Sequence, residues 1–374
     1  MKIDRIDIRN FRRLENISAG IEERETVFVG PNNSGKTSAS AIFRCFLGQR
    51  KFRIYDFSVA RIGDFDAFGA NREPDTLPSI ELDIWFKIDP ASIEYGRAVA
   101  LLPSLLVDFD RLGVQLRYAT SNPGKLREAY LAAYPQNGDD PPEKTLSAFL
   151  ATDSELNRHF EITYASLEAT DDGTIATALD KDEGRNLLQN LVRIDFVGAQ
   201  RNIDDDEENR SNRLSRAFAG FYQKNLERPE VAEEAHRVIN ENNDQLTAHY
   251  AEQFSGIMSV IKGIGVPSVN DRELKIVSTL NPETALSGNT DLLYVDVERG
   301  HELPELYNGL GFKNLIYMAI QAKHYHSQWV RTSQNRPLCQ IIFIEEPEVH
   351  LHAQVQHTFI VPRQHQWHRF DVVI

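Results

Sequence analysis

The sequence predicts an α/β fold in which a mixed β-sheet is built around a glycine-rich loop near the N-terminus. Residues 26–29, Thr-Val-Phe-Val, form a short β-branched and aromatic run that predicts a buried strand ending at Gly30. Residues 38–47 carry apolar side chains at helical spacing. Residues 80–88 alternate between apolar and polar side chains, as half-buried antiparallel strands do. A strand, loop and helix followed by antiparallel strands indicate a sheet of mixed direction.

Other segments complete this outline. Apolar residues recur at nearly every second position from Ile3 to Phe11, with one slip after Ile3, and predict an opening strand. Residues 121–142 contain Asn-Pro-Gly, Asn-Gly-Asp-Asp and Pro-Pro, and predict mostly loop. Residues 210–262 have helical spacing, with Pro229 between two helices. They hold no sustained heptads, so we expect no long coiled-coil arm.

Composition limits the setting and the partners. The chain has 374 residues and a net charge of −14, which argues against a surface that binds nucleic acid over its whole area. Residues 1–61 nevertheless hold 12 Lys and Arg against 7 Asp and Glu, which is compatible with a local DNA-binding face. Cys45 and Cys339 provide neither a disulfide framework nor a metal-binding pattern. With no secretion signal and no apolar run of membrane-spanning length, we expect a cytoplasmic chain with no membrane contact.

The glycine-rich loop carries the most specific motif. Residues 30–37, Gly-Pro-Asn-Asn-Ser-Gly-Lys-Thr, match G-x-x-x-x-G-K-[ST] between a predicted strand and a predicted helix. We expect the backbone N–H groups of this P-loop to bind the phosphates of ATP, and Lys36 to contact the β- and γ-phosphates as a catalytic residue. The Thr37 hydroxyl is expected to bind Mg²⁺; the alternative is a glycine turn that only begins a helix. The expected ATP-binding residues of this segment are Gly30, Asn32, Asn33, Ser34, Gly35, Lys36, Thr37 and Ser38.

A second motif ends the apolar run at residues 341–344, Ile-Ile-Phe-Ile. Glu345 and Glu346 follow this predicted buried strand directly. We expect Glu345 to bind Mg²⁺ through water, although Asp is the usual residue at this Walker B position. Glu346 is expected to be the catalytic base that accepts a proton from the attacking water. Two acids at a solvated strand end are the alternative interpretation.

The order of these motifs resembles that of RecF, SMC and OLD-family ATPases, which are ABC-like. Residues 8–13, Ile-Arg-Asn-Phe-Arg-Arg, resemble the I-x-N-F-R opening of these proteins, and the resemblance implies that Arg12 lies near the nucleotide. A surface arginine on an edge strand is the alternative. Residues 345–352 resemble the E-E-P-E-x-H-L-H-P box of the OLD family, with Ala353 in place of the final proline. We interpret His350 and His352 as part of a loop that meets a partner subunit, rather than as metal ligands.

Residues 307–316 resemble the signature loop and helix of ABC-type ATPases, with Asn308 in place of the usual serine. The resemblance implies that Asn308, Gly309 and Gly311 bind the γ-phosphate of ATP held by the opposite subunit. The chain is therefore expected to form a homodimer or a higher homo-oligomer through its ATPase heads. A plain helix N-terminus would have a similar sequence.

The resemblance implies a P-loop ABC/SMC-like ATPase head with a large α/β insertion. We expect residues 1–90 to form its N-terminal lobe, residues 91–270 an inserted arm or dimerisation region, and residues 271–374 its C-terminal lobe. A Toprim nuclease domain follows the ATPase in OLD-family nucleases, and 28 residues after Glu346 leave no room for one. We interpret Asp296 and Glu298 as a surface strand, not as nuclease ligands. A truncation, a frameshift or a separate nuclease chain would explain the missing part.

The expected function is an ATPase module of an OLD-like endonuclease that regulates DNA cleavage or DNA binding, in phage defence or repair. ATP and Mg²⁺ are its expected cofactors, and DNA and a nuclease part its expected partners. One alternative is an ATP-dependent dimerisation clamp that does not hydrolyse ATP, which the Glu345 departure and a missing switch histidine favour. Another is a RecF- or SMC-type DNA-repair ATPase.

Overall fold

The structure, a computed structural model, falls into two compact units. The first comprises residues 1–198, 329–346 and 361–374, and the second comprises residues 199–328 and 347–360. The residues that the structure describes are 1–22, 25–31, 34–71, 76–102, 109–136, 142–170, 173–198, 217–218, 220–221, 224, 229–253, 255, 277–278, 280, 293–296, 301–304, 310–332, 335–345 and 371–373.

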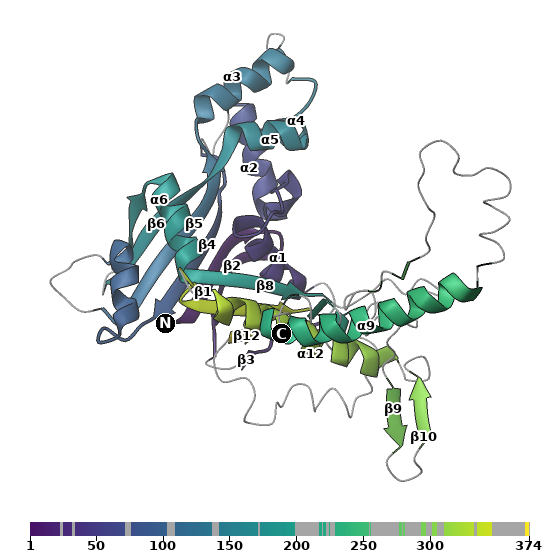
Figure 1. The fold of residues 1–374 in the computed structure, drawn as a ribbon. Coiled ribbons are helices and arrows are strands. Elements are labelled where there is room, and N and C mark those ends of the chain that lie inside the picture. The colour runs from purple at the N-terminus through teal and green to yellow at the C-terminus, as the bar shows by residue number, and fades with distance from the viewer. Residues whose placement is uncertain are drawn as a thin grey trace, which may run out of the picture. The chain divides into compact units, whose positions relative to one another are not determined.

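The first unit contains a six-stranded antiparallel sheet with the strand order β2-β1-β4-β5-β6-β7 (Figure 1). Its strands are β1 (Lys2–Phe11), β2 (Leu14–Gly20), β4 (Ile80–Lys87), β5 (Arg111–Thr120), β6 (Phe160–Thr170) and β7 (Gly173–Leu179). In register, Ile84 pairs with Ile6 on one side and with Val114 on the other, so apolar residues share one face. This confirms the alternation predicted for residues 80–88. The slip predicted after Ile3 is a register shift between Ile3 and Arg5.

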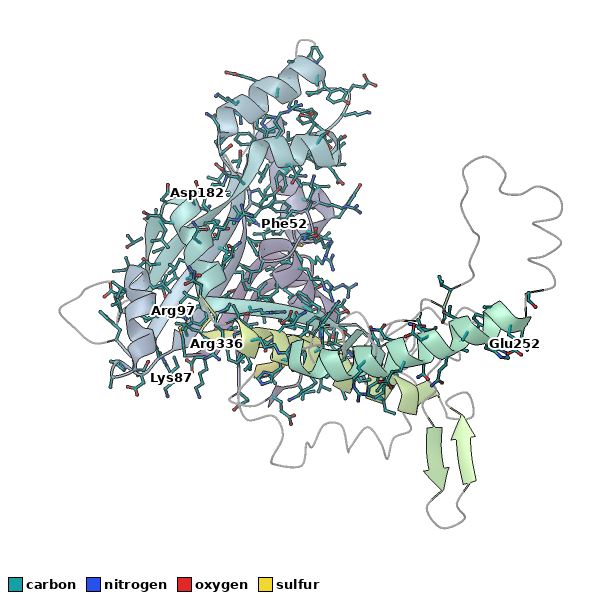
Figure 2. All side chains as sticks on the ribbon, viewed as in Figure 1. Phe52, Lys87, Arg97, Asp182, Glu252 and Arg336 are labelled. Atoms are coloured by element: carbon teal, nitrogen blue, oxygen red, sulfur yellow. The ribbon has the colours of Figure 1, made fainter. Side chains whose placement is uncertain are left out.

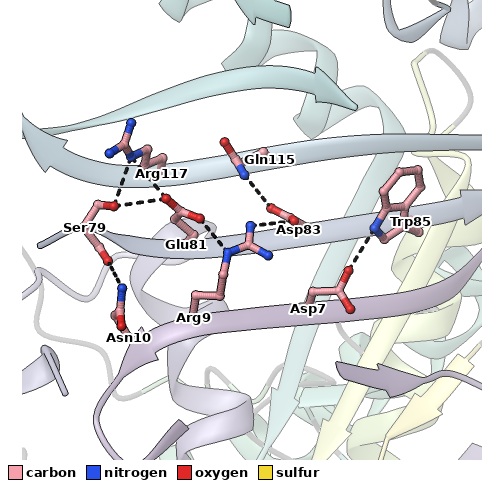
Figure 3. Close-up of polar contacts among 9 residues, drawn as sticks. All are labelled: Asp7, Arg9, Asn10, Ser79, Glu81, Asp83, Trp85, Gln115 and Arg117. Atoms are coloured by element: carbon pink, nitrogen blue, oxygen red, sulfur yellow. Dashed lines mark hydrogen bonds and ion pairs between the residues drawn. The ribbon is translucent and has the colours of Figure 1, made fainter. Parts of the chain in front are cut away.

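The other face of this sheet carries a network of charged and polar side chains (Figure 3). Arg9 on β1 donates to Glu81 and to Asp83 on β4, each at 2.6 Å. Gln115 on β5 also donates to Asp83, at 3.0 Å. Burial raises the pKa of Asp83, and the hydrogen bonds from Arg9 and Gln115 oppose that shift. The network therefore links three strands through one buried carboxylate.

A second sheet in the same unit is parallel, with the order β3-β12-β11-β8. Its strands are β3 (Glu25–Thr26), β8 (Val192–Val197), β11 (Cys339–Ile344) and β12 (Asp371–Val373). β11 is buried along its whole length, as expected for a central parallel strand, and this confirms the apolar strand predicted before Glu345.

The strand predicted at residues 26–29 is shorter than its sequence suggests. The described pairing of β3 with β12 ends at Thr26, and Val29 is 89% exposed. The β-branched residues of this run favour a strand locally, but strand formation also depends on pairing and packing with neighbours.

Helix α1 (Lys36–Phe46) packs between these sheets through aromatic contacts. Phe43 contacts Phe343 of β11, with ring centroids 5.0 Å apart, and Phe46 contacts Phe52 at 4.9 Å. Phe52 in turn stacks on Tyr118 of β5 at 4.2 Å. One chain of buried rings therefore connects the parallel sheet, the P-loop helix and the antiparallel sheet. The predicted helix at residues 38–47 is confirmed.

The remaining helices of the first unit are η1 (Ile54–Asp56), α2 (Val59–Gly69), η2 (Ile93–Leu101), α3 (Pro123–Ala133), α4 (Leu146–Leu150), α5 (Asp153–His159) and α6 (Lys181–Leu191). α6 packs closely on β6, since a Cβ on Gly184 would lie 2.5 Å from Cβ of Tyr164. Arg97 of η2, labelled in Figure 2 with Arg336, belongs to the first unit. It donates to the backbone oxygens of Arg336 and Asn190.

The prediction of mostly loop at residues 121–142 was wrong for α3. Asn122 caps this helix by accepting from the N–H of Lys125 at 3.0 Å, and Pro123 occupies its first position. Proline and asparagine are turn residues in general, but at these two positions they begin a helix.

The second unit contains α9 (Pro229–Gln253), the hairpin of β9 (Leu293–Asp296) and β10 (His301–Pro304), and most of α12 (Leu310–Arg331). α9 begins at Pro229, as its place between two predicted helices suggests. The strand expected at Asp296 is β9, and Glu298 lies outside the described residues.

β5, β6 and β7 lie in the predicted inserted region, residues 91–270, yet belong to the same sheet as β1. The boundaries at residues 90 and 270 stay predictions.

Within the described part of the chain, none of the helices combines the length and the apolar character needed to cross a membrane.

Cys45 of α1 and Cys339 of β11 are both buried. Burial, with a smaller contribution from Asp56, raises the pKa of Cys45 to about 11. Because the thiolate is the reactive form, we predict that neither cysteine reacts with a thiol reagent at pH 8 in the folded chain. Both should react once guanidinium unfolds the protein. Rapid labelling of Cys45 under native conditions would contradict the described packing of α1.

Candidate functional site

The P-loop closes tightly around its two glycines. Gly35, the residue before α1, has a φ of 105°, in the left-handed region that favours glycine. A Cβ at this position would also lie only 2.8 Å from Cδ2 of Leu14. A Cβ at Gly30 would lie 2.6 Å from Oγ of Ser34. The backbone conformation at Gly35 therefore requires glycine, whereas a side chain at Gly30 would require the Ser34 side chain to move.

The start of α1 is suited to an anion. The first N–H groups of an α-helix have no acceptor within the helix, and here no side chain caps them and no acid lies in the first turn. Lys36 begins the helix, and its Nζ donates to the backbone oxygen of Gly30 at 2.5 Å, across the loop. A phosphate fits this arrangement, because it would meet the helix dipole, the loop amides and one ammonium group together.

Glu345 lies directly beside this helix. Its Oε1 accepts a hydrogen bond from Oγ of Ser40 at 2.6 Å, although the two residues are 305 positions apart. Its backbone N–H donates to the oxygen of Val197 at the end of β8, at 3.0 Å. The parallel strands therefore place the carboxylate predicted for the Walker B position against α1, one turn after Lys36.

Arg44 also reaches this carboxylate, and the sequence analysis missed it. Its Nη2 lies 3.2 Å from Oε1 of Glu345, and its guanidinium carbon lies 3.9 Å from the ring centroid of Phe196. Lys36, Ser40 and Arg44 follow each other at intervals of four, which places them on one side of α1. That spacing is the signal in the sequence from which Arg44 could have been found.

Arg12 is held in an ion pair at the turn after β1. Its Nε donates to Oδ1 of Asp56 at 2.9 Å, and Nη2 of Arg50 lies 2.9 Å from the same oxygen. Arg12 has a φ of 52°, which is uncommon for a residue other than glycine. Leu14, two residues later, packs against Gly35, so this turn borders the P-loop. Contact between Arg12 and a nucleotide stays a prediction.

Comparison with known proteins identifies the family. Residues 1–361 match the AAA ATPase domain. The chain belongs to the AAA ATPase domain family.

One relative of this AAA ATPase domain is the endonuclease GajA of Bacillus cereus (strain HuB5-5), 22% identical over 377 residues. The match covers 96% of this chain and 51% of GajA, so the chain spans about half the length of that relative. Among solved structures, the recombination mediator protein RecF with ATP is similar, at 11% identity and a TM-score of 0.35 over 100% of this chain and 91% of RecF. A second RecF structure, with ATPrS, has 9% identity and a TM-score of 0.35 over 99% and 91%.

The structure brings together only part of the predicted site of this AAA ATPase domain. Thr37 is exposed on the first turn of α1, and Ser38 is buried. Gly311 lies in the first turn of α12, in the second unit. The other predicted residues lie outside the described residues: Asn32, Asn33, Asn308, Gly309, Glu346, His350 and His352.

The described residues contain no group of three or more His, Cys, Asp or Glu side chains that could hold a metal ion by themselves. Glu345 and the hydroxyl of Thr37 stay the predicted protein ligands for magnesium. A small number of protein ligands is typical of Mg²⁺ sites, because the ion is usually bound by one or two carboxylates together with substrate phosphates and water.

We predict that Gly35→Ala abolishes stabilisation of the AAA ATPase domain by magnesium and ATP. The substitution strains a backbone with a φ of 105° and pushes against Leu14, so the loop cannot keep its shape. The measurement is the rise in melting temperature on adding magnesium and ATP. Gly63→Ala is the matched control, because its added Cβ would meet nothing within 4 Å. An unchanged shift in Gly35→Ala would contradict the described loop.

We predict that Asp56→Asn lowers the free energy of unfolding by about 1–3 kcal/mol, since two arginines lose their buried partner. The expected loss of unfolding free energy is smaller than for a fully buried ion pair, because Arg12 and Arg50 are partly exposed. Denaturant unfolding measures it. Glu161→Gln, which removes an exposed pair with Lys181, should change stability by less than about 1 kcal/mol. Equal effects of the two substitutions would contradict a structural role for Asp56.

Proposed function

We propose that this AAA ATPase domain binds ATP with Mg²⁺, hydrolyses it, and thereby regulates DNA cleavage or DNA binding by a larger assembly. The observation that carries the proposal is the position of the Glu345 carboxylate on α1, the helix that follows the P-loop within the same compact unit. A loop that only began a helix would not require a carboxylate from a strand 305 positions later.

The residues of the P-loop would bind the phosphates. Asn32, Asn33 and Ser34 lie between the two glycines, and their backbone amides and that of Ser38 would complete the cradle. Lys36 donates to the neutral oxygen of Gly30 in the structure. A phosphate oxygen is the stronger acceptor because it is charged, so Lys36 would move its hydrogen bond to the β- and γ-phosphates.

Thr37 and Glu345 would hold the magnesium ion between them. Bound Mg²⁺ would neutralise part of the charge on the β- and γ-phosphates. Glu346 follows Glu345 directly, and we propose that it orients the attacking water and accepts its proton. Of these two adjacent acids, Glu345 would then bind the metal and Glu346 would accept the proton.

We also propose that two copies associate head to head with ATP in the interface. Asn308, Gly309 and Gly311 of one copy would contact the γ-phosphate bound by the other, and Arg12 would approach the nucleotide from the turn beside the P-loop. Support comes from the sequence resemblance and from the contact of Leu14 with Gly35. The similarity to an endonuclease twice as long supports DNA as a partner and a nuclease part outside residues 1–361.

The experiment is ATP hydrolysis by the purified chain, measured with and without DNA. We predict that Lys36→Ala lowers both ATP affinity and turnover. Glu346→Gln should keep ATP affinity and lower turnover about 100-fold or more, because general-base catalysis commonly contributes that much. Glu168→Gln, on β6, is the control for loss of one acid.

If the wild type hydrolyses ATP and both Lys36→Ala and Glu346→Gln lose this activity, the result supports an ATPase. ATP binding without turnover in the wild type would instead support a non-hydrolysing clamp, an alternative that the Glu-for-Asp change at Glu345 favours. A folded wild-type chain that binds no ATP would contradict both.

A further inference from the structure

Glu345 occupies a position where aspartate is usual, and its longer side chain contacts two side chains of α1. Its Oε1 lies 2.6 Å from Oγ of Ser40 and 3.2 Å from Nη2 of Arg44, one and two turns beyond Lys36 on α1. The Ser40 hydroxyl has the oxygen of Thr37 as a second acceptor, at 3.1 Å, but the shorter contact is to the carboxylate. Ser40 and Arg44 therefore act on the same carboxylate oxygen.

Arg44 is itself held by a side chain of β8, the strand that pairs with β11. Its guanidinium lies over the ring of Phe196 on β8, and that ring stacks on Phe343 of β11 with centroids 5.3 Å apart and an angle of 12°. Phe343 also contacts Phe43 of α1 at 5.0 Å. The planar cation is thus supported by a ring stack, an arrangement that suits arginine better than lysine.

The contacts leave one carboxylate oxygen available. Within the described part of the chain, the Glu345 carboxylate accepts its side-chain hydrogen bond and lies nearest to Arg44 through Oε1, and no hydrogen bond reaches Oε2. The side chain of a glutamate without such contacts would rotate around its side-chain bonds, and binding a metal would cost it this conformational entropy. A glutamate already held by one oxygen presents the other at less entropic cost.

We infer that Arg44, together with Ser40, is a positioning residue that holds Oε1 of Glu345 so that Oε2 can serve magnesium when ATP is bound. This inference rests on the proposed binding of magnesium and ATP. It assigns to the helix of the P-loop a second role besides phosphate binding. Arg44 orients the carboxylate and does not itself touch the nucleotide or the metal.

The experiment measures the affinity of a fluorescent ATP analogue twice for each variant, once with magnesium and once with EDTA. The ratio of the two affinities reports the contribution of magnesium, separately from phosphate binding by the P-loop. We expect Arg44→Gln to lower this ratio about tenfold with the EDTA affinity unchanged. Ser40→Ala should lower it less, and Arg44→Lys, which keeps the charge but not the planar stack, should fall between Arg44→Gln and wild type.

Arg61→Gln is the matched control, because Arg61 pairs with Asp64 on α2 and does not contact Glu345. Melting temperatures identify a variant that fails to fold. An unchanged ratio in Arg44→Gln, or an equal loss of affinity with magnesium and with EDTA, would overturn the positioning role alone. A wild-type chain without affinity for the analogue under either condition would overturn the proposed function and this inference with it.

Discussion

The Glu345 carboxylate accepts a hydrogen bond from Ser40 and pairs with Arg44, and this contact joins the C-terminal end of β11 to the helix of the P-loop. The site depends on it because it fixes where the Glu345 carboxylate lies on the helix that begins at Lys36. The parallel pairing of β11 with β8 positions the backbone of Glu345, whose N–H donates to Val197. Carboxyl ends of parallel strands and N-termini of the following helices commonly meet at ligand sites in α/β folds.

Apolar packing provides the energy that keeps these polar groups in place. Phe43, Phe196 and Phe343 form a continuous set of rings beneath Arg44. Burial of each such ring contributes on the order of 2–3 kcal/mol, whereas a partly exposed ion pair contributes about 1 kcal/mol or less. The ring stack therefore stabilises the arrangement of helix and strands. The ion pair and hydrogen bond mainly decide where the carboxylate oxygens lie.

Much of the site could be predicted from the sequence because its motifs are local. The phosphate loop is eight consecutive residues, and Glu345 follows an apolar strand that is recognisable by itself. For Arg44 the sequence offers only its four-residue spacing from Lys36 and Ser40, and the fold alone brings it to Glu345, as it brings Arg12 to Asp56. Local preference also misled at two places. Val29 belongs to a β-branched run but lies beyond the described end of β3 and is exposed, and Pro123 belongs to a turn-rich segment but begins α3.

The most direct test of this account is calorimetric titration of ATP, with magnesium, into the purified chain and into Lys36→Ala. The account predicts that the wild type binds one ATP per chain and that Lys36→Ala, although folded, loses most of this affinity. Binding of ATP to Lys36→Ala with wild-type affinity, or no binding to a folded wild-type chain, would contradict the assignment of the site to the P-loop and Glu345.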